Sequence, residues 1–271
     1  MKSLRPPAVA GSFYPRDAAV LAQDVGRYLS AARRQTPNLQ CPKAILVPHV
    51  GYLYSASTAA LAYARLVPWA DLLRRVVLVG PAHRVAFKGI ALPGVELFAT
   101  PLGSVPVDAA AVDTLLGLAS VISHPAAHAQ EHALEVQLPF LQTVLPEFSV
   151  VPLLVGDAST QAVSDALSAV WGGPETLIVI SSDLSHYHCD AQARSLDRST
   201  LQAIVTLRPQ ITHAQACGAT PMNGFLVTAA QQQLQAEILG LSNSGDAAGD
   251  RTRVVGYAAV AFLQPHGHTL H

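Results

Sequence analysis

Three short apolar stretches in the sequence each run directly into a loop that carries titratable side chains. The stretches are residues 44–47, 75–79 and 176–180, and the side chains that follow them are His49, His83, Asp183 and His186. Continuous apolar runs of this length, with several β-branched residues, are typical of strands that are buried on both faces. Open α/β sheets build their sites at the carboxyl ends of such strands, so the pattern predicts that these loops meet.

Two of these loops, together with a cysteine farther along the chain, offer the side chains that a transition metal needs. Imidazole and thiolate suit iron, copper and zinc, and three convergent ligands leave a coordination position open for chemistry. A lone histidine is more often a hydrogen-bonded loop residue, and a lone cysteine a small buried hydrophobe. Because the histidine loops recur, we predict a shared mononuclear metal site with His49 and His83 as ligands and Cys217 as a candidate third ligand.

The third loop carries an imidazole and a carboxylate, which together suit proton transfer. A histidine has an ordinary pKa of about 6.5 and therefore acts as a base or an acid near neutral pH. A neighbouring carboxylate orients the imidazole and stabilises its protonated form. We predict catalytic roles for His186 and Asp183. In the alternative interpretation, Asp183 only caps the turn after its strand.

A further polar pair precedes an apolar segment in the middle of the chain. His132 and Glu135 are three residues apart, so they share one face of the helix that the pattern predicts over residues 131–144. Pro139 within this segment predicts a kink or an early end of the helix. Glu135 is a candidate ligand, a candidate partner for a ligating imidazole, or an ordinary surface carboxylate.

The remaining pattern supplies the elements that must position these side chains. Further helices are predicted over residues 17–32, 55–66, 108–116, 159–171, 191–207 and 221–234, and further strands over residues 149–155, 236–241 and 254–263. Residues 89–92 and 95–99 indicate a hairpin at one sheet edge, because Pro93 and Gly94 separate them. Residues 5–15 indicate an irregular lead-in, and residues 242–250 indicate an exposed loop.

The composition supports an α/β domain and excludes several other classes of protein. Of the 271 residues, 50% are hydrophobic and 13% are charged, with a formal net charge of −1. This balance lacks the basic footprint of a nucleic-acid-binding protein, and no apolar run reaches the roughly 18–20 residues that span a bilayer. No signal-peptide pattern is visible, and three widely spaced cysteines fit a reducing, cytoplasmic setting.

These observations together predict one α/β domain over residues 1–264. Its central sheet is expected to be mostly parallel or mixed and to be flanked by helices. Residues 265–271 contain three histidines and almost no core-forming side chains, so we expect a flexible C-terminal tail.

Several ordered stretches of the chain resemble the Memo family, whose bacterial members are often called AmmeMemoRadiSam system protein B. The matching stretches are residues 5–15, 48–55, 80–83, 131–141, 181–187, 217–218 and 255–258. They span nearly the whole sequence. The resemblance implies a fold similar to that of class III extradiol dioxygenases, the non-haem iron enzymes that open catechol rings.

The family's metal-site pattern falls on His49, His83 and Cys217, with Asp183 and His186 in the same pocket. Ring-opening dioxygenases hold iron with two histidines and a carboxylate, and here a thiolate takes the place of the carboxylate. A thiolate changes the redox properties of the metal and the preference among metals. The resemblance therefore implies iron or copper, with zinc as a further option, and leaves ring cleavage itself open.

Three functions fit these residues. The leading hypothesis is a mononuclear metal-binding protein with redox chemistry of the dioxygenase type on a small organic substrate or dioxygen. The alternatives are an adaptor that binds a protein partner through the same pocket without turnover, and a metal-dependent hydrolase. In each case Tyr54, His132 and Glu135 are expected to support the ligands or to line the substrate pocket.

Overall fold

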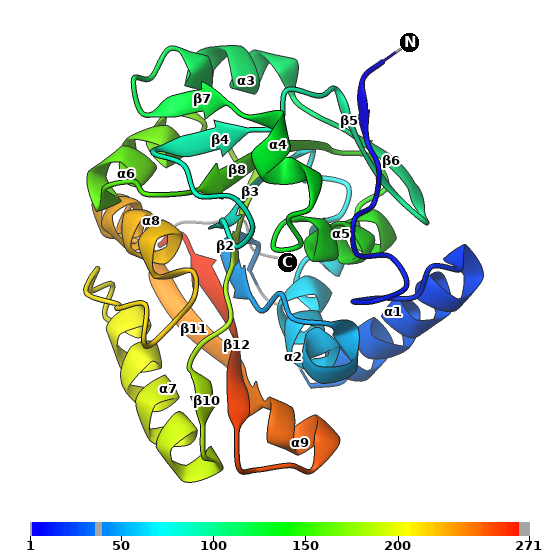
Figure 1. Cartoon of the computed structure of the whole chain (residues 1–271), viewed down its shortest axis with the longest axis vertical. Coiled ribbons are helices and arrows are strands. Elements are labelled where there is room, and N and C mark those ends of the chain that lie inside the picture. Colours follow the sequence, from blue (N-terminus) through cyan, green and yellow to red (C-terminus); the bar gives the residue numbers. More distant parts are fainter. Residues whose placement is uncertain (1, 36–39, 266–271) are drawn as a thin grey trace.

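The three apolar stretches that precede the histidine loops form neighbouring parallel strands. The computed structural model describes residues 2–35 and 40–265. Four strands pair in parallel in the order β2 (Pro42–Val47), β9 (Thr176–Ser181), β3 (Arg75–Pro81) and β8 (Ser149–Val155). They occupy the middle of a nine-stranded sheet (Figure 1). Helices cover these strands, which explains why the runs are apolar without alternation.

Alternate side chains of these strands pack into two hydrophobic cores, one on each face of the sheet. Along β2, Ile45 and Val47 belong to one core, and Ala44 and Leu46 belong to the other. Successive side chains of a strand point to opposite faces, so both faces must be covered. The first core is completed by α1 (Ala18–Arg33), α2 (Tyr52–Ala64) and α5 (Leu138–Val144), and the second by α3 (Ala109–Leu116), α6 (Thr160–Ala169), α7 (Asp190–Val205) and α8 (Ala219–Gln231).

Antiparallel strands complete the sheet, which is therefore mixed. β12 (Val254–Leu263) runs antiparallel to β2, and both β11 (Gln235–Asn243) and β10 (His186–His188) run antiparallel to β12. Toward the other edge, β4 (Ile90–Leu92) pairs antiparallel with β8 and parallel with β7 (Val121–Ser123). The prediction of a single α/β domain with a mixed central sheet flanked by helices is confirmed.

Three of the predicted helices begin at a side-chain N-cap, at the first residue of the predicted range. The side chains of Asp17, Asp108 and Ser159 each accept hydrogen bonds from backbone N–H groups in the first turn of α1, α3 and α6. A cap of this kind satisfies donors that have no partner within the helix. The local sequence therefore suffices to place the beginning of these three helices.

The predicted hairpin over residues 89–99 is wrong. β4 joins the large sheet, whereas β5 (Leu97–Thr100) lies in a separate three-stranded sheet between β1 (Leu4–Arg5) and β6 (Gly103–Pro106). Gly94, with a φ of +62°, turns the chain away from the first sheet between the two strands. Each strand then finds a partner that is distant in sequence, which a local pattern does not reveal.

The predicted helix over residues 131–144 is also wrong in its first part. The chain forms a short 3₁₀ segment, η2 (Glu135–Gln137), and then α5 (Leu138–Val144), with Pro139 in the first turn of α5. Before η2, the carboxylate of Glu131 accepts hydrogen bonds from the backbone N–H groups of His132 and Ala133. Side-chain bonds of this kind compete with the helical ladder and hold these residues in a turn.

Residues 242–250, which were expected to form an exposed loop, contain one short helix. α9 (Ser244–Ala248) begins with a capping box in which Asn243 and Asp246 bond each other's backbone. No helix in the described part of the chain is long and apolar enough to cross a membrane. The tail predicted for residues 265–271 lies, from residue 266 onward, outside the described residues.

His128 illustrates how the interior constrains a titratable group. It lies in α4 (Pro125–Ala129), is 2% exposed, and places Nε2 2.8 Å from the carbonyl oxygen of Ala91 in β4. Burial lowers the pKa of His128 to about 4, although the hydrogen bond to Ala91 acts in the opposite direction. The imidazole is therefore neutral in the folded protein near neutral pH.

We predict that His128 makes the fold sensitive to acid. Its pKa is lower in the folded chain than in the unfolded chain, so its full contribution is present above about pH 6.5 and is lost as the pH falls toward 4. His128→Gln keeps an amide donor for Ala91 but binds no proton. Between about pH 7 and pH 5, the free energy of unfolding should fall by about 2 kcal/mol more in the wild type than in the variant.

Denaturant titrations of both proteins at several pH values measure this difference. Other titrating groups, such as His132, are present in both proteins and cancel in the comparison. Parallel stability curves for the two proteins would contradict the assignment.

Candidate metal centre

The loops after β2 and β3 bring His49 and His83 together at the carboxyl edge of the sheet. Val47, the last residue of β2, stands in register with Ser181, the last residue of β9. Parallel strands in register end at the same level, so the loops that follow them become neighbours. The imidazole rings of His49 and His83 lie 5.0 Å apart, edge to face.

A buried hydroxyl group orients the His49 imidazole. Ser181 Oγ lies 2.6 Å from the carbonyl oxygen of Ala133, to which it donates its only proton. It therefore accepts from Gln137 Nε2 at 2.9 Å and from His49 Nδ1 at 3.0 Å. With Nδ1 protonated, the unprotonated Nε2 of His49 faces the cluster. This is the tautomer that a metal ligand requires.

A buried carboxylate orients the His83 imidazole in the same sense. Glu131, 2% exposed, accepts from the backbone N–H of His83 at 2.6 Å and from Nδ1 at 2.9 Å. Burial alone would lower the pKa of His83, but hydrogen bonds with Cys217 and Glu131 outweigh burial and raise it. The contact with His83 lowers the pKa of Glu131, against the effect of its own burial. Nδ1 is engaged, so Nε2 of His83 faces the cluster.

Cys217 completes the set from the loop before α8. Its Sγ lies 3.2 Å from His49 Nε2, and the donor atoms of His49, His83 and Cys217 all lie within 4.8 Å of one another. The following residue must be a glycine, because a Cβ at Gly218 would lie 2.6 Å from Cβ of Ser182. The Gly218 N–H donates to Ser182 Oγ at 3.0 Å, which fixes the loop against the end of β9.

His132 forms a third imidazole beside this cluster. Its ring lies 4.6 Å from the His83 ring and 5.4 Å from the His49 ring, and Phe13 packs on it at 4.7 Å. Burial, reinforced by the electrostatic effect of the neighbouring His49, lowers the pKa of His132. Its Nδ1 is buried and makes no hydrogen bond, although it lies 3.2 Å from Glu131 Oε1. His132 is thus a neutral imidazole within reach of the proposed ligands.

Asp183 and His186 lie on the other side of Cys217. Asp183, His186 and Cys217 each offer one donor atom, and these three atoms lie within 4.8 Å of one another. The His186 imidazole is oriented by the carbonyl of Leu184, to which Nδ1 donates at 2.8 Å. The Asp183 carboxylate instead accepts the backbone N–H of His49 at 2.8 Å, so it fixes the loop after β2 rather than the His186 imidazole.

Glu135 lies away from the cluster and holds the N-terminal segment. It is fully buried and accepts from Arg5 Nη1 at 2.7 Å, from the backbone N–H of Ala8 at 2.7 Å, and from the Tyr14 hydroxyl at 2.5 Å. These contacts hold the segment that carries Phe13, the residue that packs on His132. The structure therefore gives Glu135 an indirect connection to the site.

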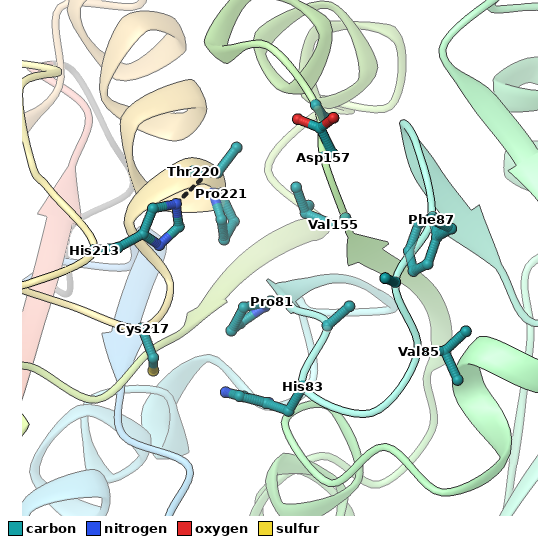
Figure 2. A pocket seen from close by; sticks show the side chains of 14 residues that line it. Pro81, His83, Val85, Phe87, Val155, Asp157, His213, Cys217, Thr220 and Pro221 are labelled. Carbon is teal, nitrogen blue, oxygen red and sulfur yellow. Dashed lines mark hydrogen bonds between the residues drawn. The ribbon is translucent and has the colours of Figure 1, made fainter.

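Tyr54 also lies outside the space that the proposed ligands share. It lines a hollow of about 260 Å³ with Val50, Arg253 and Tyr257. His83 and Cys217 line a different pocket, with a volume of about 400 Å³ (Figure 2). Val50, which also lines the hollow beside Tyr54, follows His49 directly in the chain, but none of the three proposed ligands lines that hollow.

Glu131 is the residue of this site whose role the sequence did not reveal. It stands directly before His132 in the matching stretch 131–141, but no local spacing links it to His83, 48 residues away. A carboxylate beside two histidines was the only available signal. Its contacts become visible only when the chain is folded.

Comparison with known proteins identifies the family. A family model described as Memo-like protein matches residues 5–261. The chain belongs to the Memo family. A MEMO1 family protein of Aquifex aeolicus (strain VF5) is 34% identical over 273 residues, which cover 96% of this chain and 99% of that protein. A MEMO1 family protein of Methanosarcina acetivorans is 36% identical over 278 residues, covering 95% of this chain and 98% of that protein.

The resemblance inferred from the sequence stretches is therefore confirmed at the level of the Memo family. The match covers all the side chains of the cluster, from His49 to Cys217. Similarity to the extradiol dioxygenase fold stays a prediction.

We predict that Glu131 tunes metal affinity in this Memo family member. Glu131→Gln removes the negative charge that fixes His83 Nδ1, and loss of such a partner typically weakens metal binding about 10- to 100-fold. Competition with a chromophoric chelator for Co(II) or Zn(II) measures the change. Glu147→Gln, at an exposed position outside the cluster, serves as the matched control and should bind like the wild type. Equal metal affinity in the two variants would show that Glu131 does not support the metal ligands.

Proposed function

We propose that this protein is a mononuclear metal-binding protein in which His49, His83 and Cys217 hold the metal. The observation that supports this proposal most directly is the convergence of three donor atoms within 4.8 Å of one another. The metal is iron or copper, with zinc as a third option. The bound metal supports redox chemistry of the dioxygenase type on a small organic substrate.

The chemistry of the donor set fits these metals. Two imidazoles and a thiol are borderline and soft donors, which iron, copper and zinc accept and which magnesium and calcium do not favour. The hydrogen bonds of Ser181 and Glu131 to the Nδ1 atoms leave both Nε2 atoms facing the thiol. Such support from behind the ligands is the usual arrangement in protein metal sites. Iron or copper, when bound, supplies one-electron redox chemistry.

His186 and Asp183 are the residues that we assign to proton handling. Nδ1 of His186 donates to the carbonyl of Leu184, so its Nε2 is free to accept a proton from the Cys217 thiol or from a substrate. Asp183 is 3% exposed, and its Oδ2 lies 3.7 Å from His49 Nε2. Its carboxylate therefore adds negative charge beside the ligands and favours a bound cation.

The metal ligands are tested by metal content. Protein purified without a tag should hold about one metal ion per chain, and His49→Ala and Cys217→Ser should each lose most of it, because three ligands define the site. Cys189→Ser, at an exposed free cysteine, is the matched control. Atomic emission analysis after dialysis against a defined metal buffer gives the stoichiometry. Unchanged content in all variants would show that the proposed ligands are wrong.

The catalytic assignment is tested by oxygen uptake. Protein loaded anaerobically with Fe(II) or Cu(I) should consume oxygen with a panel of catechols and thiols, and His186→Gln should retain its metal but lose about 100-fold in rate. Zn(II)-loaded protein serves as the control without redox activity. If Fe(II)- and Cu(I)-loaded proteins bind metal but consume no oxygen with any probe, a hydrolase or a non-catalytic adaptor replaces the redox function.

A further inference from the structure

The pocket that His83 and Cys217 line extends well beyond the metal ligands. Its volume is about 400 Å³, within the usual range for small-molecule sites, and its floor is formed where β3 and β8 end. Figure 2 shows His83 and Cys217 at one end of the pocket and Asp157 at the other. The side walls carry apolar residues, including Val85, Phe87 and Pro221. A molecule that spans this pocket must combine an apolar body with a polar end.

The structure presents the Asp157 carboxylate on a fixed backbone. The Asp157 N–H donates to the carbonyl of Phe87 at 2.9 Å, and the Gly89 N–H donates to the carbonyl of Asp157 at 2.8 Å. The preceding residue must be a glycine, because a Cβ at Gly156 would lie 2.4 Å from the Phe87 carbonyl oxygen. Asp157 and Phe87 therefore line the pocket from two loops whose backbones are bonded to each other.

Within the part of the chain that the structure describes, the Asp157 carboxylate has no hydrogen-bonding or ionic partner. Lys88 lines a neighbouring hollow of about 300 Å³ together with Asp157, but among the described residues no ion pair joins the two side chains. The other polar side chains at this end are already paired, because His213 Nε2 lies 3.3 Å from the Thr220 hydroxyl. The free polar group of the pocket is thus an acceptor with negative charge.

We propose that this pocket selects substrates that carry an alkylammonium group. Asp157 binds the ammonium, the Phe87 ring contributes a cation–π contact, and the apolar walls enclose a hydrocarbon body that reaches toward the metal ligands. This inference rests on the proposed function, since it names the substrate class for the metal site of His83 and Cys217. In this proposal substrate specificity comes from Asp157, which is not one of the proposed metal ligands.

The test compares two probes of similar size and shape, one with a terminal ammonium group and one with a neutral hydroxyl group. Binding of 2-phenylethylamine and of 2-phenylethanol to Zn(II)-loaded protein is measured by calorimetry, because zinc leaves both probes unoxidised. The amine should bind about 10-fold or more tightly than the alcohol, and Asp157→Asn should remove this preference without weakening alcohol binding. Phe87→Ala should weaken both probes, which places them in this pocket rather than elsewhere on the surface. Asp165→Asn, an exposed carboxylate of α6, is the matched control.

Two results would overturn the inference. One is equal or better binding of the alcohol, or of 3-phenylpropionate, by the wild type. The other is an amine preference that persists in Asp157→Asn. Metal content is measured in the same samples, so the two proposals fail separately. Normal metal content without amine preference rejects only the substrate class, whereas metal content that is insensitive to His49→Ala rejects the metal site.

Discussion

The parallel register of β2, β9 and β3 is the constraint on which the candidate site depends. Backbone hydrogen bonds make these strands end at one level, so the loops that follow them meet although they are far apart in sequence. Ser181, at the end of β9, connects the strand ends to the cluster through a single hydroxyl. It accepts from His49 and from Gln137 and donates to the chain beside His132, so one side chain fixes both a ligand loop and the segment facing it.

Buried carboxylates hold the remaining segments around this cluster. An unpaired charge in the interior costs several kcal/mol, so each carboxylate determines what must lie beside it. Glu131 is paired with His83, Glu135 is paired with Arg5, and Asp183 accepts backbone N–H groups of the loop after β2. The irregular N-terminal segment and the segment before α5 thus keep defined positions without regular secondary structure of their own.

These constraints together orient the donor atoms of the candidate site toward one another. Its imidazoles present Nε2 atoms to one thiol because their Nδ1 atoms are engaged from behind. The thiol and His83 open toward a pocket with apolar walls, while Asp183 and His186 close the opposite side. The candidate metal centre therefore has one side open to the pocket and one side closed by an imidazole and a carboxylate. Membership of the Memo family is consistent with this arrangement, since the family match spans the whole site.

The sequence by itself determined the buried strands, the capped helices and the loops that deliver His49, His83 and Asp183. Those features depend on local apolar runs and on side chains that bond neighbouring backbone, which short-range patterns reveal. Only the tertiary structure decided that residues 89–99 separate into two sheets and that the residues before η2 form a turn. It also decided the contact between Glu131 and His83 and the place of Asp157 in the pocket that His83 lines, because these residues are distant in sequence and come together only in the fold.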